Sequence, residues 1–408
     1  MEISLFSASA VFQGALPHPV FIMTSLGPIF ADDLARVKPG DRLRLTISAQ
    51  TSDAAALAQA ALEARARGER VLVVCADPAD VPRLAQEMPW FEPNLDVRPL
   101  PDWETLPYDV LSPQEELVSE RLEALYRLTA PTGGADVLLT SAVTASQRLS
   151  PVSYIGANTF FFHQGEQISL TTLQKRLAAA GYANVKQVLA AGEFAVRGSI
   201  VDVFPMGSER PFRLDFFDDE IESIRWFDVD TQRSMESAEE IRLLPGHEFP
   251  VDPEALLAFR QRWRREFAGD PKKSIVYCDI EKEILPPGIE YYLPLFFDET
   301  AALTDYLPPN ARVFLLGDIE AALQAFGRDM ASRYKVLAAD PQRPALAPER
   351  IWLKPEEFFK SLANFARFTV EKKENAEDLK CLSGIEVDRK SQNPVGKLLE
   401  RTRESAMK

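Results

Sequence analysis

Between Arg42 and Pro151, short apolar runs alternate with longer segments in which apolar residues recur every three or four positions. Short runs rich in Val, Ile and Leu are typical of buried strands, and the longer segments are typical of amphipathic helices. The predicted strands are 42–48, 70–76, 96–100 and 136–140, and the predicted helices are 53–68, 81–88 and 113–128. Regular exchange of strands and helices predicts a doubly wound α/β domain with a parallel sheet.

The pattern changes at Phe160 and becomes rich in short strands after Gly192. Ser169 is expected to cap a helix, and the turn formers after it divide residues 192–227 into three or four strands. An acidic group surrounds one of these turns (Asp215, Asp218, Asp219, Glu220 and Glu222). We interpret this group as a β-hairpin with solvent-facing acids rather than a metal site, because Asp-Asp suits a tight turn.

Beyond His247 the α/β pattern returns. We expect a helix after Asp252, strands at 274–280 and 311–318, and an aromatic core segment at 288–297. Ser112 and the following proline predict that the helix at 113–128 begins at Pro113, since Ser is favoured at the N-cap and Pro at the first helical position.

The expected organisation is an α/β domain interrupted by a small α+β domain. The segments are a disordered leader (1–26), the first half of the α/β domain (27–158), the inserted domain (159–245), the second half (246–370), a polar linker (371–390) and the truncated start of a further α/β domain (391–408). Met23 is a candidate for the true start, because the preceding residues have neither a basic region nor a cleavage site typical of a secretory signal.

The chain has 408 residues, 46% of them hydrophobic, and a formal net charge of −15. Such a surface repels nucleic acid, whose binding requires cationic patches. The charge balance is reversed from Leu170 to Arg213, a segment that contains six Lys and Arg residues but only three acids. This segment is therefore a candidate patch for an acidic partner. No apolar run is long enough to span a membrane.

Cysteines and histidines give little support for metal or redox chemistry. Three cysteines without close spacing predict a reducing, cytoplasmic setting. Of the three histidines, only His163 has an acid at ligand spacing, Glu166, and one such pair is not a metal site. We therefore expect no metal, no cofactor and no catalytic residue in this chain.

The loop after the first predicted strand is where an α/β domain would hold a nucleotide phosphate. Between Thr46 and Ala66 it contains neither glycine nor lysine, so it lacks the amide cradle and the charge of a P-loop. The acids Asp102, Glu104 and Asp109 lie close together in sequence, but we expect them to brace the following helix, since no nucleophile lies nearby.

Arg197 and Arg213 lie on predicted strands that are otherwise apolar. Guanidinium groups held on a rigid sheet suit two-pronged recognition of carboxylates. The alternative is structural: Arg197 closes a salt bridge to Glu193 or Asp202, and the aromatic residue Phe217 belongs to an ordinary core.

Several long motifs, taken together, resemble the N-terminal, UvrB-like region of the bacterial transcription-repair coupling factors. The resemblance covers roughly residues 29–400, and its most specific parts are DWETLPYD (102–109), SERLEALYRL (119–128), GEFAVRGSIVDVFPMGSE (192–209), PFRLDFFDDEIESIRWFDVDTQRS (211–234), LLPGHEFP (243–250) and GIEYYLPLFF (288–297).

The resemblance implies a degenerate, P-loop-like α/β domain without ATPase activity and an inserted domain that recruits the repair protein UvrA. It implies that Arg197, Arg213 and Phe217 contact UvrA. RNA polymerase, DNA, ATP and magnesium would be bound by parts of the family protein that this chain lacks. The long DNA-clamping hairpin of UvrB-like proteins is also missing, since DWETLPYD passes directly to SPQEELVSERL.

Two other functions remain open at this point. One is an enzyme that uses the α/β cleft for a nucleotide or nucleic acid; stabilisation by nucleotides would support it. The other is direct DNA binding, which the acidic composition and the missing hairpin oppose.

Overall fold

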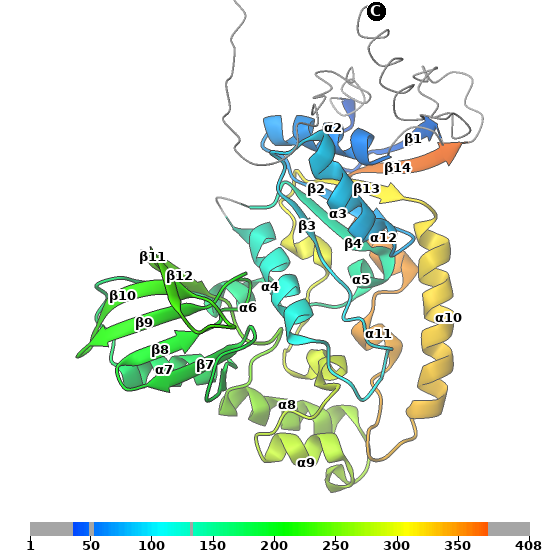
Figure 1. Ribbon diagram of the computed structural model, residues 1–408. Helices are drawn as coiled ribbons and strands as arrows, with labels where there is room; N and C mark the ends of the chain where they lie inside the picture. The colour runs from blue at the N-terminus through cyan, green and yellow to red at the C-terminus, as the bar shows by residue number, and fades with distance from the viewer. Residues whose placement is uncertain (1–35, 49–52, 131–133, 374–408) are drawn as a thin grey trace, which may run out of the picture.

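The computed structural model describes residues 36–48, 53–130 and 134–373 (Figure 1). The predicted leader, with Met23, lies outside the described residues, and so do almost the whole predicted linker and the segment 391–408. Among the residues that the structure describes, no helix is long and apolar enough to cross a membrane.

A six-stranded, wholly parallel sheet confirms the predicted α/β class. In spatial order its strands are β1 (Arg42–Ser48), β14 (Ala366–Lys373), β13 (Arg312–Leu316), β2 (Val71–Cys75), β4 (Val137–Ser141) and β3 (Val97–Pro99). The last two strands in sequence lie between β1 and β2, so the chain returns to this sheet after forming the second one.

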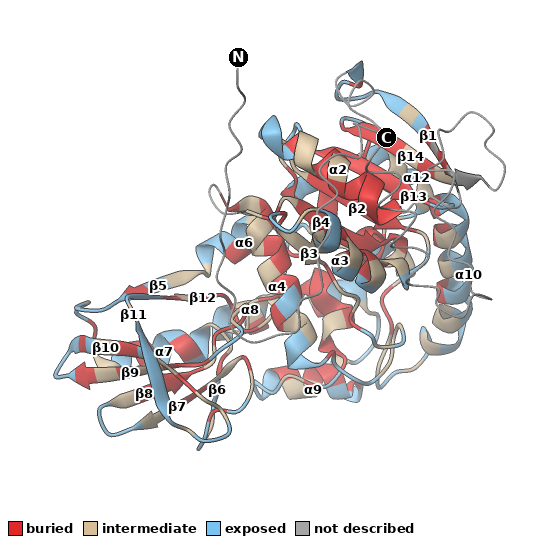
Figure 2. Cartoon of the chain, turned by 45° about the horizontal axis from the view of Figure 1, so that its top comes forward, coloured by how far each residue is buried: buried red, intermediate tan, exposed pale blue. Residues whose placement is uncertain are grey.

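The central strands of the parallel sheet are buried on both faces, as their red colour in Figure 2 shows. Alternate strand residues point to opposite faces. Val73 packs towards α2 (Asp53–Ala66) and α3 (Asp80–Phe91), whereas Val74 packs towards the opposite layer. That layer contains α4 (Glu115–Thr129), α5 (Ala142–Ser146), α10 (Ile319–Leu337) and α12 (Pro355–Ser361).

A second six-stranded sheet projects to one side of the molecule, in green in Figure 1. Its order is β11 (Ser234–Ala238), β10 (Glu220–Phe227), β9 (Phe212–Phe217), β8 (Ile200–Val203), β7 (Glu193–Arg197) and β6 (Ala183–Asn184). Helix α7 (Leu170–Ala179) packs on one face through Leu173 and Leu177. Its predicted cap is confirmed, because the Ser169 hydroxyl accepts a hydrogen bond from the amide of Thr172.

The predicted hairpin is also confirmed, with Asp218 at a φ of 52° in the turn between β9 and β10. β5 (Phe160–His163) pairs with β12 (Glu240–Leu243) in a separate two-stranded sheet. The remaining helices are α6 (Val152–Ala157), α8 (Pro253–Glu266), α9 (Ile275–Glu281) and α11 (Pro348–Ile351), with 3-10 turns η1 (Pro271–Lys273), η2 (Ile289–Leu295) and η3 (Leu303–Tyr306).

Two local predictions are wrong. The segment expected to be a strand at 274–280 is the helix α9. The Ser274 hydroxyl caps its first turn, and the helix buries Val276, Tyr277 and Ile280. Helix α4 begins at Glu115 rather than Pro113. The Ser112 hydroxyl, expected to be its cap, instead donates to Glu290 (2.8 Å) and accepts from the amide of Gly288 (3.0 Å).

The aromatic segment 288–297 packs in a core, as predicted. Tyr291 and Tyr292 of η2 are buried with Trp263 of α8 and Trp352 beside α11 in one aromatic cluster. The helix expected after Asp252 is confirmed as α8, whose first amides bind the Asp252 carboxylate.

Candidate protein-docking face

The face of the second sheet that points away from α7 carries charged and aromatic side chains near the tips of two hairpins. Directly paired residues of neighbouring strands point to the same side of a sheet. Arg197 pairs with Ile200, and Asp202 pairs with Arg213. Phe217 is four residues beyond Arg213 on β9 and therefore shares its face. We call these five residues the docking face.

Asp202 holds the two arginines of the docking face. Its carboxylate is fully buried and accepts hydrogen bonds from Nε (2.7 Å) and Nη2 (3.0 Å) of Arg213. Arg197 donates to the same carboxylate through Nη2. The hydrogen bonds that Arg213 donates to Asp202 raise the pKa of Arg213 above its usual value. One buried anion on β8 thus fixes two cations on the strands that flank it, β7 and β9.

Arg213 is almost entirely engaged within the protein. Its Nη1 donates to the carbonyl of Gln232 (3.2 Å) and the hydroxyl of Ser234 (3.1 Å), and its guanidinium lies 5.0 Å from the Phe227 ring centre. Only 14% of its side chain is exposed. The geometry therefore gives Arg213 a supporting position.

Arg197 and Phe217 are open to solvent. The Arg197 side chain is 48% exposed, and its described hydrogen bonds use one of its three guanidinium nitrogens. Phe217 is 69% exposed, so it is not a core residue. Burying such a ring against a partner contributes about 1.5–3 kcal/mol.

Of the two acids expected as alternative partners of Arg197, Asp202 is the one that binds it. Glu193 accepts hydrogen bonds from the amides of Leu189 (2.7 Å) and Ala190 (3.0 Å), while Asp202 binds Arg197. The sequence did not reveal that Asp202 also binds Arg213. Asp202 lies between two valines of β8, and a charge at such a buried strand position requires a counter-charge. This pattern could have indicated that Asp202 binds the arginines of neighbouring strands.

The acids of DWETLPYD do not brace α4. Asp102 accepts from the Thr144 hydroxyl of α5 (2.9 Å) and from the amide of Glu104 (3.2 Å). Asp109 accepts from the amide of Val110 (2.6 Å). These contacts hold a loop, and the expectation that the acids support the following helix is wrong.

No group of three or more metal-ligating side chains occurs in the described part of the chain. Glu166 accepts a hydrogen bond from the backbone amide of His163 (3.1 Å), and the His163 ring lies 3.4 Å from Glu240. At the hairpin, Asp215 accepts from the Ser223 hydroxyl (2.9 Å).

The position after β1 is only partly described, because residues 49–52 lie outside the described ranges. Asp53 begins α2, is 2% exposed and receives two hydrogen bonds from Arg83 (3.0 and 2.8 Å). The hydrogen bond to Asp53 contributes most to raising the pKa of Arg83. A carboxylate therefore lies at the helix end where a nucleotide-binding domain would hold phosphate.

Three of the long motifs meet in one buried cluster. Glu248 accepts hydrogen bonds from Nε (2.5 Å) and Nη2 (3.2 Å) of Arg121 and from the indole of Trp103 (3.2 Å). Arg121 also donates to the carbonyl of Pro101 (2.7 Å) and is fully buried. The Trp103 ring contacts Tyr291 edge to face at 5.4 Å, which brings in a fourth motif.

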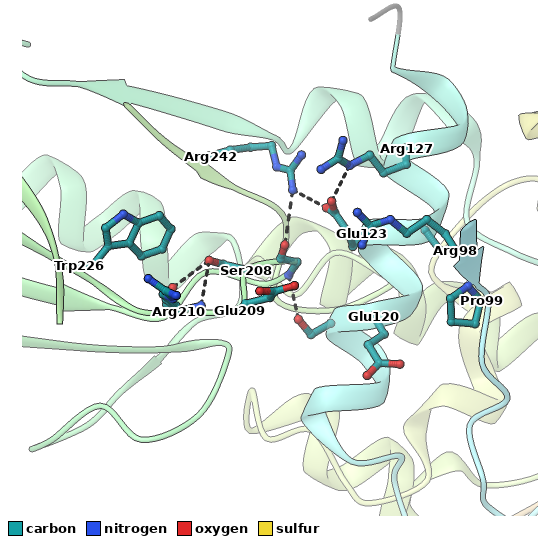
Figure 3. Close-up of a pocket in the computed structure, with 13 residues that line it drawn as sticks. Arg98, Pro99, Glu120, Glu123, Arg127, Ser208, Glu209, Arg210, Trp226 and Arg242 are labelled. Atoms are coloured by element: carbon teal, nitrogen blue, oxygen red, sulfur yellow. Dashed lines mark hydrogen bonds and ion pairs between the residues drawn. The ribbon is translucent and has the colours of Figure 1, made fainter. Parts of the chain in front are cut away.

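A cavity of about 610 Å³ lies between α4 and the second sheet (Figure 3). Two of its arginines, Arg127 and Arg242, bind Glu123, and the amide of Gly207 donates to Ser119 of α4 (2.8 Å). Gly207 has a φ of 75°, and a Cβ atom there would lie 2.7 Å from the Glu123 carboxylate. These contacts join the second sheet to α4.

Comparison with known proteins relates the part of the chain that contains the second sheet to a known domain family. Residues 160–249, which contain α7, this sheet and Glu248, match the UvrB interaction domain. The chain is 42% identical over 298 residues to the transcription-repair-coupling factor of Escherichia coli, covering 73% of this chain and 26% of that protein. The factor of Haemophilus influenzae is 42% identical with the same coverage, and that of Bacillus subtilis is 32% identical over 49% of this chain and 18% of the relative.

The chain therefore contains a segment similar to the UvrB interaction domain. It is homologous to the N-terminal region of transcription-repair-coupling factors, and it spans about a quarter of the length of the E. coli and H. influenzae relatives.

Proposed function

We propose that this chain recruits UvrA in transcription-coupled repair through the docking face. The observation that carries the proposal is the pairing of an exposed phenylalanine with a half-exposed arginine on a rigid sheet inside a UvrB interaction domain. Interfaces concentrate their binding energy in a few aromatic and arginine residues that become desolvated together.

Phe217 and Arg197 have complementary tasks in this proposal. The Phe217 ring would enter an apolar socket on UvrA and exclude water around the neighbouring charge. Arg197 would donate charge-assisted hydrogen bonds to a carboxylate of UvrA, while Asp202 keeps its guanidinium in place. Since Asp202 is already buried, Arg197 needs little reorganisation on binding.

We further propose that the parallel-sheet domain, 27–158 with 246–370, is a degenerate P-loop-like scaffold that binds no nucleotide and has no ATPase activity. The buried Asp53 carboxylate supports this proposal because it would repel a phosphate at the first turn of α2. Residues 159–245 would form the inserted UvrA-binding domain.

In a complete protein, this region would serve a cytoplasmic factor that recognises RNA polymerase stalled at DNA damage. That factor would release the polymerase by ATP-driven translocation on DNA and recruit excision repair. The acids of DWETLPYD are engaged in loop contacts, and the site supports recruitment better than an enzymatic use of the cleft.

Calorimetric titration with purified UvrA tests the recruitment proposal. We expect saturable binding by the wild-type chain, and Arg197→Ala and Phe217→Ala should each weaken it by about 1–3 kcal/mol with unchanged melting temperature. Trp90→Ala is the matched control, because Trp90 is 86% exposed but lies on α3, outside the docking face. A folded wild-type chain that does not bind UvrA would contradict the proposal.

Thermal unfolding with ATP and magnesium tests the scaffold proposal. A ligand present at 100 times its dissociation constant would stabilise the fold by about 2.7 kcal/mol. We expect no change in melting temperature at millimolar ATP. A clear rise in melting temperature with ATP and magnesium would show instead that the cleft binds nucleotide.

A further inference from the structure

A third arginine lies beside the docking face and has no counter-charge. Arg225 of β10 is directly paired with Arg213 of β9, so both side chains point to the same side of the sheet. The Arg225 side chain is exposed and has no hydrogen bond or ion pair with any described residue.

The acids around Arg225 are already engaged. Both oxygens of Asp202 accept hydrogen bonds from Arg213, and Arg197 shares one of them. Asp215 accepts from Ser223. Glu236 of the neighbouring strand β11 pairs with Arg210 (3.7 Å).

Like charges directly opposite each other on neighbouring strands destabilise a sheet. Asp202 forms an ion pair with Arg213, but no described acid forms an ion pair with Arg225. An acidic group brought by a partner would supply the missing counter-charge. Arg225 would therefore gain an ion pair from an acidic partner. Arg213 would not, because its guanidinium already has an ion pair and hydrogen bonds within the protein.

We propose that Arg225, together with Arg197, makes the direct cationic contacts with carboxylates of UvrA, and that Arg213 is a positioning residue acting through Asp202. This inference rests on the proposed function. Arg197 and Arg225 lie on β7 and β10, three strand spacings apart, which is about 14 Å. The complementary patch on UvrA would present carboxylates about that far apart, with an apolar socket for Phe217.

Charge reversal at Arg225 gives the direct test. We expect Arg225→Ala to raise the Kd for UvrA about 5–20-fold and Arg225→Glu to raise it more than about 50-fold, with slower association at low salt. Arg225→Lys should retain most of the association rate. The melting temperature should not fall, since the like-charge pair with Arg213 is relieved.

Arg176→Glu is the matched control, because Arg176 is exposed on α7, which covers the opposite face of the sheet. It changes the net charge equally and should leave the affinity within about twofold. If Arg225→Glu binds like the wild type while Arg197→Ala is weakened, the role of Arg225 is overturned and the docking face stands. If the wild-type chain does not bind UvrA, both proposals fail.

A double-mutant cycle tests the positioning role of Arg213. Arg213→Ala should lower both affinity and melting temperature in the wild-type chain. In the Arg197→Ala background it should cost little further affinity, because the contact that it positions is already lost. Equal losses of affinity in both backgrounds would show that Arg213 contacts UvrA independently.

Discussion

Glu248→Ala should lower the free energy of unfolding by about 3–5 kcal/mol, because it leaves the buried charge of Arg121 without a partner. Arg121 is fully buried and Glu248 is 3% exposed, so water cannot replace the lost contact. The indole of Trp103 loses its hydrogen-bond acceptor in the same variant. Denaturant unfolding monitored by tryptophan fluorescence measures the loss.

The matched control is Arg333→Ala, which breaks an exposed Arg–Asp pair on α10 and should change stability by less than about 0.5 kcal/mol. Replacing both buried partners, as in Arg121→Met with Glu248→Leu, should recover most of the loss, since no unpaired charge remains. A loss below 1 kcal/mol for Glu248→Ala would mean that Arg121 finds another partner or that water enters the cluster.

This cluster explains why the long motifs occur together without forming a catalytic site. Trp103, Arg121 and Glu248 come from segments on both sides of the second sheet in sequence, and their contacts fix where that sheet leaves and rejoins the α/β core. Glu123 and Arg242 add a second junction at the cavity of Figure 3. The motifs thus orient the docking face relative to the parallel sheet.

Elements with strong local signals were predictable from the sequence. Asp252 before a proline specified the start of α8, Ser169 specified the start of α7, and Asp218-Asp219 specified the β9–β10 turn. Each signal acts within a few residues, through a cap or through a turn conformation. The strand and helix alternation likewise predicted the parallel sheet.

Predictions failed where distant residues decide the outcome. Ser112 has the local pattern of a helix cap but binds Gly288 and Glu290, which are more than 170 residues away. The apolar run of α9 is compatible with a strand or a buried helix, and its length alone could not distinguish them. At the docking face, the sequence predicted that both arginines lie on strands. It did not predict that Arg197 and Arg213 bind the same carboxylate, because this depends on how the strands pair.

Asp202→Asn should weaken the second sheet by about 3 kcal/mol, and it should also weaken UvrA binding at least about 10-fold if Arg197 contacts UvrA. An asparagine has one acceptor oxygen and no charge, so it cannot hold the two guanidinium groups that Asp202 holds. Arg213, with 14% of its side chain exposed, would be left as a poorly compensated charge.

Thermal unfolding and UvrA titration of Asp202→Asn, performed below its melting temperature, separate these two effects. The matched control is Asp215→Asn on β9, which makes the same chemical change at a partly buried acid whose described partner is the Ser223 hydroxyl. It should cost less than about 1 kcal/mol. If Asp202→Asn lowers stability but binds UvrA normally, the carboxylate supports only the fold. Arg197 would then not need a fixed position to bind, and the argument for a preorganised docking face would be wrong.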